Sequence, residues 1–84
     1  MRIEILGPGC PRCRATEQVV REQVRALGME AEVLHVSDPE AFRRYRVMFT
    51  PAVVIDGELV FAGHVPKPEH VQQALVQRLQ RRTD

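Results

Sequence analysis

The segment 51–63, PAVVIDGELVFAG, constrains the fold most, because it encodes two neighbouring strands and the turn that joins them. Two runs rich in β-branched and aromatic residues flank Asp56-Gly57, a dipeptide that is favoured in two-residue hairpin turns. The two strands are therefore expected to pair in antiparallel fashion. Any fold considered for this chain has to contain a β-hairpin late in the sequence.

Residues 2–6, RIEIL, predict a strand that leads straight into the two cysteines of the chain. Ile3 and Ile5 alternate with a polar residue, which is the pattern of a strand with one buried face. The segment Gly7-Pro8-Gly9 follows, and both of its residue types interrupt regular structure. Cys10 is therefore expected to lie just beyond the end of the first strand.

A helix is predicted over residues 11–27, immediately after the first cysteine. Proline is favoured at the first helical position and glycine just beyond the last, so Pro11 and Gly28 suit the two ends. Apolar or small side chains recur at spacings of three and four, as they do on the buried face of a helix. These residues are Cys13, Thr16, Val20, Val24 and Leu27.

Three further elements are predicted from local pattern. Residues 30–36 alternate as a second strand, and residues 37–45 form a short helix for which Ser37 and Asp38 are alternative N-caps. A last helix begins at Pro68. The side chains that share one face of this last helix are Val71, Ala74, Leu75, Arg78 and Leu79.

The predicted order of elements is β-α-β-α-β-β-α, which indicates an α/β fold. A helix long enough for a parallel crossover separates the first two strands, and the last two strands form the hairpin. The simplest compact arrangement is one mixed four-stranded sheet flanked by three helices. Because the chain has 84 residues and shows no linker or repeat, residues 1–84 are expected to form a single domain.

Composition and charge narrow the classes of function. Hydrophobic residues make up 44% of the chain and charged residues 27%, which is ordinary for a folded globular protein. The net charge of +1 gives no field that would attract nucleic acid or anionic lipid, and no apolar run approaches the ~20 residues that span a bilayer. We therefore expect a cytoplasmic monomer with no nucleic-acid or membrane partner. A structural disulfide is disfavoured there, because thiols are kept reduced.

The two cysteines are expected to be chemically unequal. Cys10 falls at the N-cap of the predicted helix, where free backbone N–H groups and the positive end of the helix dipole favour a thiolate. Arg12 and Arg14 add positive charge in the same turn, which also lowers a thiol pKa from its usual ~8.5. Cys13 falls on the apolar stripe and should be buried and protonated. This pattern predicts that Cys10 is the nucleophile and that Cys13 resolves the mixed disulfide.

Metal binding is the alternative chemistry, because a C-x-x-C pair is also half of a zinc site. A closed zinc site needs four ligands, and the remaining candidates, His35, His64 and His70, are not paired at the spacing of common zinc modules. An alternative function remains, in which the same thiols bind or deliver a metalloid or a soft metal such as Cu(I). Small ferredoxin-like metallochaperones carry such a motif, but their fold needs the order β-α-β-β-α-β. We therefore expect no dedicated metal site and no cofactor.

Essentially the whole chain resembles the thioredoxin superfamily, and most of all its very small, glutaredoxin-sized "redox-active disulfide" members from bacteria and archaea. The resemblance rests on Cys10-Pro11-Arg12-Cys13 after the first strand, Thr50-Pro51 before the third, and Asp56-Gly57 with Gly63 around the hairpin. It implies a thioredoxin-like fold in which Pro51 follows a cis peptide bond and faces the cysteines. It also implies that the backbone of Thr50 offers hydrogen bonds to an extended substrate.

Together, these features predict a thiol–disulfide oxidoreductase of the thioredoxin or glutaredoxin type. Cys10 and Cys13 would be its catalytic residues. Its partners would be protein or small-molecule disulfides, and a thioredoxin-reductase-type or thiol electron donor. The residues expected to bind substrate are Pro11, Arg12, Thr50 and Pro51.

The chain departs from the pattern of the superfamily in three ways. Gly9 stands where thioredoxins have a tryptophan before the first cysteine. The segment 62–65, Ala-Gly-His-Val, replaces the segment that helps glutaredoxins hold glutathione, so glutathione is not implied as the working thiol. The buried acid of thioredoxins has no firm counterpart, and Glu4 is its only candidate. Proton transfer during resolution is therefore not assigned to a residue.

Two groups of residues near the expected site have either a functional role or none beyond that of ordinary loop residues. Met48 and Phe49 precede Thr50 in a predicted loop, where they either form an apolar lip for a partner or serve as ordinary loop residues. His64 follows the fourth strand, where a solvated loop histidine is favoured over a group that tunes Cys10.

Overall fold

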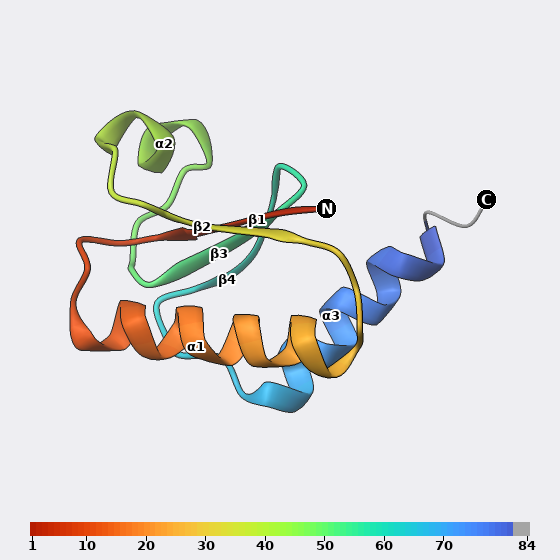
Figure 1. Ribbon diagram of the computed structural model, residues 1–84. Helices are drawn as coiled ribbons and strands as arrows, with labels where there is room; N and C mark the ends of the chain where they lie inside the picture. The colour runs from red at the N-terminus through yellow and green to blue at the C-terminus, as the bar shows by residue number, and fades with distance from the viewer. Residues whose placement is uncertain (82–84) are drawn as a thin grey trace.

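The computed structural model describes residues 1–81, so the last three residues of the predicted domain lie outside the described part. The elements follow one another in the predicted β-α-β-α-β-β-α order (Figure 1). They are β1 (Arg2–Leu6), α1 (Pro11–Ala26), β2 (Glu32–Val36), α2 (Pro39–Arg44), β3 (Ala52–Ile55), β4 (Glu58–Ala62) and α3 (Pro68–Arg81). The second strand begins at Glu32 rather than at residue 30, and the other bounds lie close to those predicted.

The strands form one four-stranded sheet in the order β2-β1-β3-β4. β1 runs parallel to β2 and antiparallel to β3, and β3 pairs with β4 in the predicted hairpin. Leu6 pairs with Ala52, and Ala52 pairs with Ala62. The residues that follow Leu6, precede Ala52 and follow Ala62 therefore meet at one end of the sheet.

Helices cover both faces of the sheet, as the alternating pattern of β1 requires. Ile3 and Ile5 point into the larger core, where they pack with Val20 of α1 and Leu75 of α3. Leu6 belongs to a smaller core on the opposite face, beneath α2. Figure 1 shows α1 and α3 on one side of the sheet and α2 on the other. The predicted mixed sheet flanked by three helices is confirmed.

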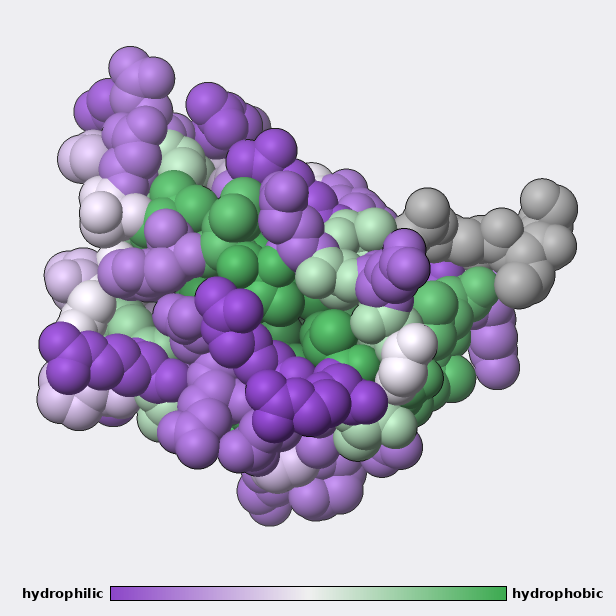
Figure 2. Space-filling model, in the orientation of Figure 1, coloured by the Kyte–Doolittle hydropathy of each residue, from purple (hydrophilic) through white to green (hydrophobic). Residues whose placement is uncertain are grey.

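Helix α1 has one apolar and one polar face. Cys13, Thr16 and Val20 of the predicted stripe are buried. The outward face is polar, as Figure 2 shows over this part of the molecule, and it carries Arg14, Glu17, Gln18, Arg21, Glu22 and Arg25. α1 has 16 residues, and none of the helices within residues 1–81 is long and apolar enough to cross a membrane.

The structure decides two local questions about turns and caps. The carboxylate of Asp38 accepts a hydrogen bond from the backbone N–H of Glu40 at 3.0 Å, so Asp38 rather than Ser37 is the N-cap of α2. Asp56 and Gly57 have φ values of 49° and 84°, as the predicted two-residue hairpin turn requires.

Candidate active site

Three segments meet at the end of the sheet where β1 stops, and direct contacts link them. A Cβ atom on Gly7 would lie 3.8 Å from the Cβ of Thr50, so these two segments touch. The backbone N–H of Gly63 donates to the carbonyl of Pro51 at 2.9 Å. The guanidinium Nη2 of Arg12 donates to the carbonyl of Gly63 at 2.9 Å. The cysteine motif, the Thr50-Pro51 segment and the turn after β4 therefore enclose one site.

The two thiols lie at the start of α1 and differ in exposure. Cys10 is the N-cap residue and is half-buried, whereas Cys13, one turn into the helix, is 1% exposed. Their Sγ atoms are 3.1 Å apart. A disulfide bond is about 2.05 Å long, so a small movement of the side chains would close it. The unequal burial expected from the apolar stripe is confirmed.

Hydrogen bonding and burial move the two thiol pKa values in opposite directions. The hydrogen bond from the Cys13 thiol, helped by the backbone N–H groups of Cys13 and Arg12, lowers the pKa of Cys10. Burial raises the pKa of Cys13, and its hydrogen bond to Cys10 raises it further. The sequence suggested that the charges of Arg12 and Arg14 would act on Cys10, but hydrogen bonds are the causes that the structure gives. The arrangement suits a thiolate at Cys10 and a thiol at Cys13.

Alkylation by iodoacetamide should separate the two thiols in the folded protein. Because only a thiolate reacts, the labelling rate of Cys10 should reach half its plateau below pH ~8.5, while Cys13 is labelled slowly at every pH up to that value. Peptide mass spectrometry after timed labelling measures both rates. In denaturant the two residues should label alike. Equal labelling rates in the folded protein would contradict the asymmetry.

Gly7 is a buried residue that allows Cys13 to occupy its place. A Cβ atom at position 7 would collide with the Sγ of Cys13 and would lie 3.3 Å from its Cβ. A glycine is needed here because another segment approaches its backbone closely. The sequence pattern identified Gly7 only as an interruption of the strand, since the contact joins the end of β1 to α1.

The peptide bond between Thr50 and Pro51 is cis. Pro51 is fully buried, whereas Met48 and Phe49, which precede this pair, are 85% and 68% exposed. A Cβ atom on Gly63 would lie 3.2 Å from the Cβ of Phe49, so Phe49 packs beside the turn after β4. The loop therefore presents two exposed apolar side chains next to the Thr50-Pro51 segment.

His64 is an exposed residue of the turn after β4. Its Nδ1 donates to the carbonyl of Ala62 at 3.2 Å, and its ring meets Phe61 edge-on with the centroids 6.3 Å apart. These contacts fit the solvated loop histidine that the sequence favoured.

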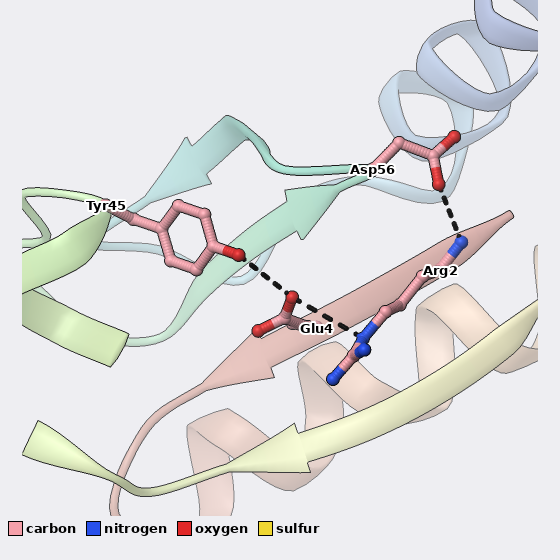
Figure 3. Close-up of polar contacts among 4 residues, drawn as sticks. All are labelled: Arg2, Glu4, Tyr45 and Asp56. Carbon is pink, nitrogen blue, oxygen red and sulfur yellow. Dashed lines mark hydrogen bonds and ion pairs between the residues drawn. The ribbon is translucent and has the colours of Figure 1, made fainter. Parts of the chain in front are cut away.

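Glu4 is a buried acid, 7% exposed, but its contacts lie away from the thiols. The hydroxyl of Tyr45 donates to its Oε1 at 3.0 Å, and Nε of Arg2 lies 3.7 Å from the same atom (Figure 3). Tyr45 follows α2 on one face of the sheet, whereas Cys13 belongs to α1 on the other. Glu4 therefore anchors the end of α2 to β1, on the face of the sheet away from Cys13.

The two thiols are the only sulfur atoms of cysteine that could serve as metal ligands, since the chain has two cysteines. Within residues 1–81, no group of three or more histidine, cysteine, aspartate and glutamate side chains is arranged to hold a metal ion. Cys10 and Cys13 are thus a pair of sulfur ligands without a third protein ligand in the described part of the chain.

The sequence of the chain matches that of a known protein family. A protein-family model described as "Thioredoxin domain" matches residues 1–76. The chain belongs to the thioredoxin family. It is 37% identical to a thioredoxin from Methanocaldococcus jannaschii over 73 residues, and this match covers 87% of this chain and 84% of that protein. It is 32% identical to a thioredoxin from Methanothermobacter thermautotrophicus over 75 residues, and this match covers 89% of this chain and 97% of that protein.

A solved structure supports the thioredoxin fold directly. Thioredoxin 1 from Thermosipho africanus TCF52B matches over 100% of both chains, with a TM-score of 0.69 and 20% sequence identity. The thioredoxin-like fold predicted from the sequence is therefore confirmed. The enzyme class, a thiol–disulfide oxidoreductase, is confirmed at the level of the thioredoxin family.

Proposed function

We propose that this protein reduces protein disulfides by dithiol–disulfide exchange through Cys10 and Cys13. The observation that carries the proposal is the pair of unequal thiols at the N-terminus of α1, with Sγ atoms 3.1 Å apart. The pKa of the outer thiol is lowered and that of the inner thiol is raised, which matches the needs of a nucleophile and a resolving thiol.

In the first step, the thiolate of Cys10 attacks one sulfur of the substrate disulfide. A bond forms between that sulfur and the Sγ of Cys10, the substrate S–S bond breaks, and the other substrate sulfur leaves as a thiolate that takes a proton from water. Until that attack, the Cys13 thiol stabilises the thiolate through the hydrogen bond between the two sulfurs.

In the second step, the sulfur of Cys13 attacks the Sγ of Cys10, and the proton that Cys13 loses passes to the leaving substrate sulfur. The mixed disulfide breaks, the second substrate sulfur leaves as a thiol, and the Cys10–Cys13 disulfide forms. Two electrons pass from the protein to the substrate. A thioredoxin-reductase-type protein or a thiol then returns two electrons to the protein. The cytoplasm, where thiols are kept reduced, is the compartment we propose for this cycle.

The substrate would lie as an extended segment across the Thr50-Pro51 segment. Thr50 is partly exposed beside the thiols, and its backbone would pair with the substrate backbone. Pro51 is fully buried and would form the floor of the site beneath it. Pro11 and Arg12 are exposed between the two cysteines, and the bond from Arg12 to the carbonyl of Gly63 ties this motif to the turn after β4, so both residues would lie at the edge of the substrate site.

Met48 and Phe49 would form the apolar lip of this substrate site. Replacing both with serine should raise KM for a protein disulfide such as insulin about three- to tenfold, because apolar surface is no longer buried on binding. The rate with a small disulfide that cannot reach the lip should stay unchanged. Leu59, an exposed apolar residue near the hairpin turn at the other end of the sheet, gives the matched control as Leu59→Ser. An equal loss with both substrates would argue against a docking role.

Reduction of insulin by the protein in the presence of dithiothreitol tests the proposed function. Catalysed precipitation of the insulin B chain, well above the rate with dithiothreitol alone, is expected. No acceleration, together with a stoichiometric metal complex that survives purification, would favour the soft-metal module instead.

A further inference from the structure

His35 of β2 lies beside the turn that leads from β1 to the two cysteines. Its Nε2 is 2.9 Å from the carbonyl oxygen of Gly7. Because a carbonyl oxygen only accepts hydrogen bonds, Nε2 carries the proton and donates it. The backbone N–H of Gly7 donates to the carbonyl of Val36 at 3.0 Å. β2 therefore holds both polar backbone groups of Gly7, one through its main chain and one through the His35 ring.

The His35 ring also contacts the far side of this turn. A Cβ atom on Gly9 would lie 3.5 Å from Cε1 of His35, so the ring packs alongside the backbone of Gly9. Gly9 has φ of 86° and directly precedes Cys10. The imidazole thus spans the turn from Gly7, which touches Cys13, to Gly9, which leads into Cys10.

The turn has few other means of holding its shape. Pro8 has no backbone N–H to donate, and the two glycines have no side chain to anchor. At the same time, the position of Gly7 has to be maintained closely, because its backbone lies against Cys13 with no room for a Cβ atom. A side chain from the neighbouring strand supplies the constraint that the turn itself lacks.

We propose that His35 is a positioning residue of the active site, whose Nε2–H holds the Gly7-Pro8-Gly9 turn so that Cys10 sits at the helix N-cap and Cys13 against Gly7. The imidazole acts on the thiols through the backbone of the turn, not by contact with a sulfur atom. Its importance for catalysis rests on the proposed function, but its effect on thiol geometry can be measured without any disulfide substrate.

The test compares His35→Phe, which keeps a flat ring but removes the donor, with His35→Gln, whose amide N–H can donate to Gly7. His70→Phe and His70→Gln make the same changes at an exposed position of α3. The readouts are the pH profile of Cys10 alkylation by iodoacetamide and the melting temperature. His35→Phe should slow alkylation at pH 7 about three- to tenfold and move the midpoint of its profile to higher pH, the scale of one lost hydrogen bond. His35→Gln and both His70 variants should stay close to the native protein.

An unchanged rate of Cys10 alkylation in a folded His35→Phe variant would overturn the proposal. A His35→Gln variant whose alkylation slows as much as that of His35→Phe would also overturn it. If His35→Phe does not fold, His35→Ala replaces it in the same comparison with His35→Gln. Insulin reduction by the native protein separately tests the proposed function. If the native protein does not reduce insulin but the His35 and His70 variants show the expected alkylation rates, the positioning role of His35 stands and only the proposed reaction is refuted.

Discussion

Replacing Cys10 with serine should reduce insulin reduction to the uncatalysed rate, whereas replacing Cys13 with serine should trap the substrate on the protein. Without Cys10, the exposed nucleophile is gone, and the buried Cys13 with its raised pKa cannot take its place. Without Cys13, the first step still occurs, but no internal thiol 3.1 Å away releases the substrate. Both single substitutions therefore stop turnover, and they do so at different steps.

Mass spectrometry under non-reducing conditions distinguishes the two steps. The Cys13→Ser protein should gain the mass of one substrate chain after incubation with a disulfide peptide, and dithiothreitol should remove it. The Cys10→Ser protein and the double variant should gain none. An adduct that forms on Cys10→Ser as readily as on Cys13→Ser would reverse the assignment of nucleophile and resolving thiol.

Replacing Gly7 with alanine should destabilise the protein strongly, because Gly7 is the one glycine of the five at which an added Cβ atom would collide with a buried side chain. The added Cβ atom meets the Sγ of Cys13 in a buried site, where overpacking costs about 2 kcal/mol. For a chain of this size, such a loss lowers the melting temperature by about 10 °C. If Cys13 instead rotates away to relieve the clash, Cys10 loses the hydrogen bond that lowers its pKa, and its alkylation profile moves to higher pH.

A double-mutant cycle isolates this contact. In a Cys13→Ala background, Gly7→Ala should cost at least about 1 kcal/mol less, because the Sγ atom is no longer there and the remaining Cβ lies 3.3 Å away. Gly28→Ala is the matched control: nothing lies within 4 Å of its added Cβ, and its cost arises only from φ of 63°. Additive effects of Gly7→Ala and Cys13→Ala would show that the two residues do not constrain each other.

The fold was predictable because its strongest signals are local. The alternation at Ile3 and Ile5 predicted which residues of β1 enter the larger core, and Asp56-Gly57 predicted the hairpin turn. The stripe on α1 predicted the burial of Cys13, and with it the difference between the thiols. Each pattern spans only a few residues, and the known periodicity of side chains along a helix or a strand is enough to predict which of them are buried.

The features that sequence analysis missed depend on contacts between distant elements. The need for glycine at position 7 arises from the approach of α1 to the end of β1. His35 was considered only as a metal ligand, because its place beside Gly7 follows from the parallel register of β1 and β2. Glu4 was named only as a candidate for the buried acid of thioredoxins, and its partner Tyr45 and its place on the face covered by α2 follow from the sheet topology. Register and packing, rather than residue type, decide these cases.

Titration of the reduced protein with one equivalent of a disulfide peptide, in the absence of oxygen, tests directly whether Cys10 and Cys13 pass two electrons to a substrate disulfide. The protein should lose two hydrogen atoms and both free thiols as Cys10 and Cys13 become joined in one disulfide, and two peptide thiols should appear. Mass spectrometry and thiol counting measure all three changes. A protein that keeps both thiols free, while the peptide disulfide stays intact, would show that the pair does not carry out dithiol–disulfide exchange.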